Sequence, residues 1–244
     1  MDECNGIKTP MERNYNIEIN DNTEVLDVPY RELIGSLIYL TVTTRPDLTF
    51  AVSYLSRFLD KPNEELWKAG KRVVRYLKET KEKGLLFKKT NDNNLYGFSD
   101  ADWAGDRSDR KSVSGGIILQ GQNPIAWFSK KQQCVTLSSA ESEYVAAASL
   151  AQEFVNLKGI CKHLGCDVNA VLFVDNKSAI SMAKNYENSK RTKHIDIRFH
   201  YIKDLVVNKV ISIEHICTNE NLADVMTKSL STDKFYKCIK KFLC

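Results

Sequence analysis

The sequence lacks the long apolar runs, the paired cysteines and the leader that would place a chain in or beyond a membrane. Its longer apolar stretches, such as 117–119 and 171–174, fall far short of the roughly 20 residues of a membrane-spanning helix. The seven cysteines are odd in number and form no CxxC pair, which argues against a disulfide framework and for a reducing compartment. The N-terminus, Met1-Asp2-Glu3-Cys4-Asn5, has no basic-then-apolar leader, so we do not expect secretion. These absences favour an intracellular protein without a membrane partner, with cytoplasmic, particle-associated and nuclear locations equally open.

The composition is that of an ordinary globular protein. Hydrophobic residues make up 43% and charged residues 27% of the 244 positions, which is enough for one large domain or two modest ones. The net charge of +4 is too small to indicate a nucleic-acid partner by itself. The organisation of the chain is therefore more informative than its overall composition.

The first third of the chain has a helical pattern. Residues 1–26 are polar and aperiodic, and we expect a flexible lead-in there. From Tyr30 onward, apolar residues recur at helical spacing, and Arg45-Pro46 and Lys61-Pro62-Asn63 break the pattern into three helices. The sequence therefore predicts a small helical segment over 27–90, before the turn-rich stretch Asn91–Asn94.

Beyond this joint the pattern alternates between strands and helices. We expect strands at 95–100, 113–120, 125–129, 171–175 and 210–215. Helices are expected from Ser138 onward and over 178–184, 195–207 and 222–230. This order predicts an α/β (α+β) domain over 91–230 that contains five strands. We interpret 231–244 as a basic C-terminal tail.

Acidic residues stand at the ends of these expected elements. Asp100 ends the first strand, and Asp175 ends the short apolar strand at 171–175. Glu141 and Glu143 lie in the first turns of the long helix, and Asp224 lies at the start of the last helix. A carboxylate that follows apolar strand residues is costly to bury unless a cation neutralises it, and Mg²⁺ prefers such oxygen ligands. Helix capping is the alternative for Asp175 and Asp224.

Several motifs in order resemble the RNase H module of copia-type long-terminal-repeat retrotransposons. They are Ser99–Gly105, Asp109–Gly115, Ser138–Tyr144, Asp175–Ile180, Arg191–Arg198 and Leu222–Lys228. Upstream, Tyr30–Leu40, Thr44–Asp47 and Lys71–Lys78 resemble the helical segment between the polymerase palm and RNase H of the same polyproteins. The likeness covers almost all of the chain beyond residue 30, and it implies that 27–90 is the connection segment of a reverse transcriptase. It also implies that 91–230 has the RNase H-like fold, a mixed five-stranded sheet flanked by helices.

The resemblance implies a role for each acid. Asp100 would bridge two Mg²⁺ ions, for which Mn²⁺ can substitute; Glu143 and Asp175 would hold the second ion, and Asp224 the first, beside the attacking water. Glu141 competes with Glu143, which we prefer because Glu143-Tyr144-Val145-Ala146 better fits the family's pattern. We rank Asp102 below Asp100 because we expect it on the opposite face of the strand.

The same resemblance implies an RNA–DNA hybrid as the substrate, cleaved in its RNA strand, and the polymerase palm and fingers as an upstream partner. Basic residues that would contact the nucleic acid lie in two clusters, and solvated helix faces are the alternative. They are Lys71, Arg72, Arg75, Lys78, Lys193, His194 and Arg198.

Two other functions remain open at this point. The chain could be a catalytically inactive remnant that only binds nucleic acid, although acids stand at all four sites. An integrase-like transferase fits less well, because the order here is Asp, Glu, Asp, Asp. No Tyr-x-Asp-Asp signature occurs, so we do not expect DNA synthesis.

Overall fold

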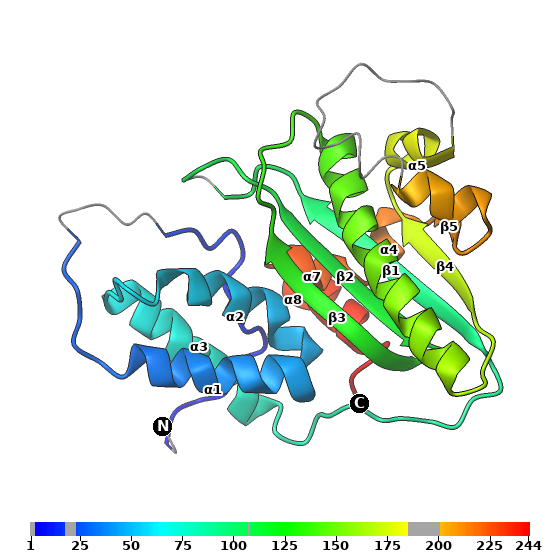
Figure 1. Cartoon of the computed structure of the whole chain (residues 1–244). Helices are drawn as coiled ribbons and strands as arrows, with labels where there is room; N and C mark the ends of the chain where they lie inside the picture. The colour runs from blue at the N-terminus through cyan, green and yellow to red at the C-terminus, as the bar shows by residue number, and fades with distance from the viewer. Residues whose placement is uncertain (1–2, 18–22, 107, 185–200) are drawn as a thin grey trace. The chain divides into compact units, whose positions relative to one another are not determined.

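The computed structural model describes residues 3–17, 23–106, 108–184 and 201–244 (Figure 1). The chain divides into two compact units: Met1–Leu86 together with Lys228–Cys244 form a helical unit, and Phe87–Thr227 form a sheet unit. No helix in these described ranges is long and apolar enough to cross a membrane.

In its described residues, the helical unit contains the three helices that the sequence predicts, and a fourth. They are α1 (Tyr30–Thr43), α2 (Thr49–Leu55), α3 (Glu64–Glu79) and α8 (Thr232–Ile239), with 3₁₀ turns at Pro46–Leu48 and Ser56–Phe58. The Asn63 side chain caps α3 by accepting a hydrogen bond from the Leu66 amide at 2.9 Å. Ile34, Leu66 and Val73 are fully buried in this unit.

Helix α8 lies where we expected a basic tail over 231–244. Its residues Phe235, Cys238 and Ile239 are buried, and the ring of Phe235 meets that of Tyr76 edge-on at 5.7 Å. The amide of Gly84 donates to the carbonyl of Cys244 at 2.8 Å, and the Cys244 amide returns the bond at 3.0 Å. The lysines that suggested a tail lie among apolar residues that belong to the core of this unit.

A buried ion pair lies at the start of the 3₁₀ turn Pro46–Leu48. The Asp47 carboxylate accepts hydrogen bonds from Arg45 Nε at 2.9 Å, Arg45 Nη2 at 2.8 Å and the Tyr76 hydroxyl at 2.6 Å. Arg45 Nη2 also donates to Thr80 Oγ1 at 2.6 Å. Burial lowers the pKa of Arg45, but the hydrogen bonds and negative charge of Asp47 outweigh this and raise it. The sequence indicated a helix break at Arg45-Pro46 and a family motif over Thr44–Asp47, but it did not predict this ion pair.

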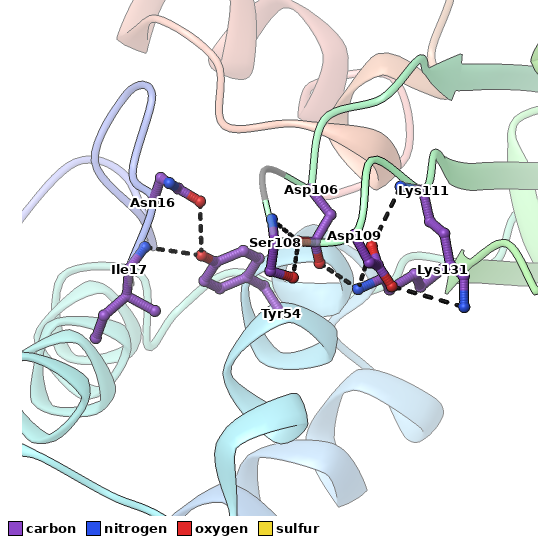
Figure 2. A network of polar contacts seen from close by, with 8 residues as sticks. All are labelled: Asn16, Ile17, Tyr54, Asp106, Ser108, Asp109, Lys111 and Lys131. Carbon is purple, nitrogen blue, oxygen red and sulfur yellow. Dashed lines mark hydrogen bonds and ion pairs between the residues drawn. The ribbon is translucent and has the colours of Figure 1, made fainter. Parts of the chain in front are cut away.

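Residues 3–17 of the expected lead-in contain no helix or strand and yet pack in this unit. Met11 and Ile17 are buried, and the Ile17 amide donates to the Tyr54 hydroxyl at 3.0 Å (Figure 2). Tyr15 packs edge-on against Tyr54 at 5.8 Å, and burial raises the pKa of Tyr15 to about 12. The polar composition of 1–26 predicted a flexible segment, because only a few of its side chains are apolar and buried.

The sheet unit contains a five-stranded mixed sheet in the order β3-β2-β1-β4-β5. Its strands are β1 (Asn94–Asp102), β2 (Val113–Gln120), β3 (Asn123–Lys131), β4 (Asn169–Val174) and β5 (Ser212–His215). The β1–β2 and β2–β3 pairs are antiparallel, whereas β1–β4 and β4–β5 are parallel. The predicted mixed five-stranded sheet flanked by helices is therefore confirmed.

Helices cover both faces of this sheet (Figure 1). The long helix α4 (Ser139–His163) lies over β1 and β2, where its Phe154 and Leu150 would meet a Cβ placed on Gly97. The short helix α7 (Asp224–Thr227) packs on β1, β2 and β3, where Met226 and Thr227 would meet a Cβ on Gly115. Helix α5 (Lys177–Lys184) and residues 201–207 add further helical packing. The expected helix over 222–230 is thus only one turn long.

The loop between β1 and β2 is held by an ion network. Lys131 of β3 pairs with Asp106, and with Asp109 at 3.0 Å (Figure 2). Burial raises the pKa of Asp106, but hydrogen bonds from Lys131 and Ser108 outweigh this and lower it to about 2. The network fixes the chain directly after the end of β1.

Candidate active site

Asp100 and Asp175 lie side by side at the edge where two parallel strands end. The β1–β4 register pairs Phe98 with Phe173, and each aspartate stands two residues beyond this pair. Parallel neighbouring strands end at the same edge of a sheet, so the register brings the two carboxylates together. Asp100 is only 2% exposed, whereas Asp175, which directly follows β4, is half-buried.

Glu143 and Glu141 differ in what their carboxylates contact. Glu143 Oε1 accepts a hydrogen bond from the Ala101 amide at 3.2 Å, which draws the side chain to the end of β1. Glu141 Oε2 accepts from the Leu137 amide at 2.7 Å, while the Ser138 hydroxyl accepts from the Glu141 amide at 3.3 Å. Glu141 therefore stabilises the start of α4 in the manner of a capping box, and Glu143 is the glutamate that faces β1.

The structure brings Asp100, Glu143 and Asp175 into one group. One carboxylate oxygen from each residue lies within 4.8 Å of those of the other two, and this is the one group of potential metal ligands in the described part of the chain. Two of the three residues are buried. Three carboxylates from β1, α4 and the end of β4 thus converge, which is an arrangement suited to a hard divalent cation.

Asp224 is buried in α7 but is not a member of that group. It is the first residue of the helix, and it is fully buried. The capping alternative does not apply to Asp175, because the residue that caps α5 is Asn176, whose Oδ1 accepts from the Ala179 amide at 3.0 Å. Asp224 does occupy the first turn of a helix, which is consistent with the helix-capping alternative.

Asp102 requires a correction to our reasoning. Asp100 and Asp102 are two residues apart in β1, so strand alternation places them on the same face and not on opposite faces. The structure separates them differently. The carboxylate of Asp102 turns over Gly105, where a Cβ would lie 2.0 Å from its Oδ2. It is absent from the group formed by Asp100, Glu143 and Asp175.

Three of the four basic residues predicted on α3 contact the segment 4–12. Arg72 pairs with Glu12 at 3.0 Å, and burial lowers its pKa. Arg75 Nε donates to the Asn5 carbonyl at 2.8 Å, and Lys78 Nζ donates to the Cys4 carbonyl at 2.8 Å. Lys71 lies over the ring of Trp67 at 5.5 Å. These contacts give the three residues a structural part within the helical unit.

The second predicted basic cluster, Lys193, His194 and Arg198, lies outside the described residues. Sequence reasoning also missed two residues of the described site. The Asn221 side chain donates to the Ser99 carbonyl at 2.9 Å, and the Thr227 hydroxyl donates to the Asp100 carboxylate. Both residues lie within or next to the run Leu222–Lys228 that carried the resemblance, but no spacing rule singles them out.

Comparison with known proteins identifies the origin of the chain, although no protein-family model matches it. It is 41% identical over 221 residues to the retrovirus-related Pol polyprotein from transposon TNT 1-94 of Nicotiana tabacum, which covers 90% of the chain. It is 37% identical over 238 residues, or 96% of the chain, to that from transposon RE2 of Arabidopsis thaliana. The chain belongs to the copia-type retrotransposon Pol family. This Pol segment spans 17% and 16% of the lengths of these two relatives.

The sheet unit of this Pol segment is an RNase H-like domain, as its strand order and flanking helices show. Among solved structures, LC11-RNase H1, isolated from compost, aligns with 60% of the segment and 99% of its own chain at 17% identity. The TM-score is 0.43, so the fold is assigned from the topology of the sheet and not from this alignment.

Proposed function

We propose that the chain is a ribonuclease H that cleaves the RNA strand of RNA–DNA hybrids with divalent metal ions. The observation that carries this proposal is the convergence of Asp100, Glu143 and Asp175, whose carboxylate oxygens lie within 4.8 Å of one another. Membership of the copia-type Pol family and the RNase H-like topology support it. The activity and substrate of the far longer Pol relatives come to this chain only as part of the proposal.

The donor set fits Mg²⁺ or Mn²⁺. It consists of oxygen atoms alone, and Asp100 and Glu143 are at most 6% exposed, so three negative charges close together need a cation to offset their burial. We assign Asp100, Glu143 and Asp175 as metal ligands, with Asp224 as the fourth acid. A bound pair of such ions activates a water molecule and stabilises the leaving oxygen of a phosphodiester.

The chain's own residues supply the rigid frame for this chemistry. Strand pairing fixes Asp100 and Asp175, and the Ala101 amide fixes Glu143 by donating a hydrogen bond to its carboxylate. Because these backbone groups are set by the sheet, the carboxylates need little reorganisation when a cation binds. Asp224 stands nearby on α7, whose Thr227 contacts Asp100.

The proposed substrate is a hybrid whose A-like shape is recognised through its backbone and ribose 2′-hydroxyls. Lys193, His194 and Arg198 are the proposed contacts closest in sequence to the acids of the sheet unit. On α3, Lys71 remains the better candidate, because Arg72, Arg75 and Lys78 already bind the segment 4–12. The polymerase palm and fingers are the proposed upstream partner.

A matched pair of substitutions on α4 tests this function. The full chain is incubated with a labelled RNA–DNA hybrid and Mg²⁺ or Mn²⁺, beside Glu143→Gln, Asp175→Asn and Glu141→Gln. We expect Glu143→Gln and Asp175→Asn to lower the cleavage rate by at least about 100-fold, since each removes a ligand charge. Glu141→Gln, equally buried on the same helix, should keep most of the activity.

The outcomes separate the proposal from its rival. Cleavage of the RNA strand alone, lost in the two ligand variants, supports a ribonuclease H. Hybrid binding by a folded chain without cleavage under either metal would refute catalysis by this chain and favour a binding remnant. If Glu141→Gln loses activity and Glu143→Gln keeps it, the assignment of the two glutamates is reversed.

A further inference from the structure

Two side chains connect the segment of helix α7 to the end of β1, one just before the helix and one at its last residue. Before the helix, the Asn221 side chain donates to the Ser99 carbonyl at 2.9 Å. At its last residue, the Thr227 hydroxyl donates to the carboxylate of Asp100. Asn221 and Thr227 are fully buried, and Asp100 is 2% exposed. Two side chains from one short segment therefore hold consecutive residues of β1.

Gly115 makes this close approach possible. The β1–β2 register places Gly115 directly opposite Asp100, on the face that α7 covers. A Cβ at Gly115 would lie 2.6 Å from Thr227 Cγ2, 2.7 Å from Met226 Cβ and 2.9 Å from the Met226 carbonyl carbon. Any side chain here would have to push α7 away from the sheet. The absence of one brings the Thr227 hydroxyl to the carboxylate.

The hydroxyl of Thr227 has one hydrogen and two acceptors within reach. One is Asp100 Oδ2, and the other is the Asp224 carbonyl at 3.2 Å, three residues earlier in the same helix. A charged carboxylate is the stronger acceptor, so the hydrogen goes to Asp100. Bonded at Oδ2, the carboxylate cannot rotate freely about its Cβ–Cγ bond, and its second oxygen is held in one direction.

We propose that Thr227 is a positioning residue that orients Asp100 for a divalent cation, and that Gly115 provides the space this contact needs. The inference rests on the proposed function, because that function is what makes Asp100 a candidate ligand for a divalent cation. Hydrogen-bond partners behind a metal ligand fix its orientation, and their loss commonly weakens metal binding by about 10- to 100-fold.

The test measures metal binding without nucleic acid or turnover. Mn²⁺ is titrated into the full chain, and the free ion is followed by electron paramagnetic resonance. Thr227→Val, which keeps the shape and removes the hydroxyl, should weaken binding by about tenfold or more. Thr227→Ser, which keeps the hydroxyl, should stay within about threefold of the wild-type chain. Gly115→Ala places a methyl group on β2 against α7, and it should also weaken Mn²⁺ binding, as Thr227→Val does.

Each outcome decides the matter. Equal Mn²⁺ affinity in Thr227→Val and the wild-type chain, with both folded by circular dichroism, overturns the positioning role and leaves the proposed function intact. If Thr227→Val does not fold, Gly115→Ala and Thr227→Ser decide between the two results. A wild-type chain that binds Mn²⁺ but does not cut hybrid overturns the proposed function, and the Mn²⁺ titration still judges Thr227. A wild-type chain that binds no Mn²⁺ overturns both.

Discussion

Asp47→Asn removes the negative charge that neutralises a buried cation in the helical unit. The guanidinium of Arg45 is held by two bonds to Asp47, and the two side chains are only 6% and 0% exposed. The Tyr76 hydroxyl donates to the same carboxylate, and burial raises the pKa of Tyr76, so this phenol stays protonated as a donor. After the substitution the Arg45 charge remains buried without its counter-charge.

The expected loss follows from that geometry. Breaking a buried pair by removing one partner costs about 3–5 kcal/mol, because the other charge stays desolvated. At about 1.4 kcal/mol per tenfold, this corresponds to amide exchange in α1–α3 that is faster by roughly two to three and a half orders of magnitude. Hydrogen exchange with mass spectrometry measures this locally, which matters because two units need not unfold together.

An exposed pair in the same unit supplies the control. Arg31 and Asp60 are 2.5 Å apart, but their side chains are 67% and 92% exposed. Asp60→Asn should therefore change exchange in the same helices by less than about tenfold, as surface pairs contribute about 0–1 kcal/mol. Equal effects of Asp47→Asn and Asp60→Asn would refute the reasoning that burial of Arg45 makes its partner essential.

Two further predictions concern the sheet unit. Gly97→Ala should lower the free energy of unfolding by about 1–3 kcal/mol, because its Cβ would lie 2.4 Å from Phe154 Cζ. Gly159→Ala on α4 meets nothing within 4 Å and should raise the free energy of unfolding by about 0.5–1 kcal/mol. Urea unfolding of both variants measures the contrast. The pKa of Asp106 is lowered from 3.8 to about 2, so its pairing with Lys131 stabilises the fold above pH 3.8 and this contribution is lost as the pH falls toward 2. The stability difference between wild type and Asp106→Asn should shrink across that window, and a difference independent of pH would contradict the assignment.

The strands and long helices could be predicted because their patterns are local. Short strand-forming runs between polar turns indicated β1 and β2, and Ser138 was expected at the start of α4, where it is the N-cap. The end of the chain could not be predicted in this way. Lys234 and Lys237 suggested a solvated tail, although Phe235 and Ile239 stand at helical spacing and are buried. What those residues pack against, Tyr76 among others, lies far away in the sequence.

The candidate site was predicted in its residue types more fully than in its geometry. Asp100 and Asp175 were proposed from their places at the ends of strands, and Glu143 was preferred to Glu141 because it fits the family's pattern; the structure brings these three together. That Asp224 is not a member of the group, and that Thr227 contacts Asp100, depends on how one helical turn packs on the sheet. Such packing depends on Gly115, whose importance appears only once the strand register is known.

The division of the chain has a consequence for the order in which it folds. The helical unit is made from two separate stretches, Met1–Leu86 and Lys228–Cys244, with the whole sheet unit between them. A ribosome therefore completes Phe87–Thr227 before it delivers the helix that covers Tyr76. The sheet unit can therefore finish folding before the helical unit, whose apolar surface stays exposed until α8 has been synthesised. A chain that ends at Thr227 would keep the whole sheet unit, but it would lose Phe235 and Ile239 from the core of the helical unit.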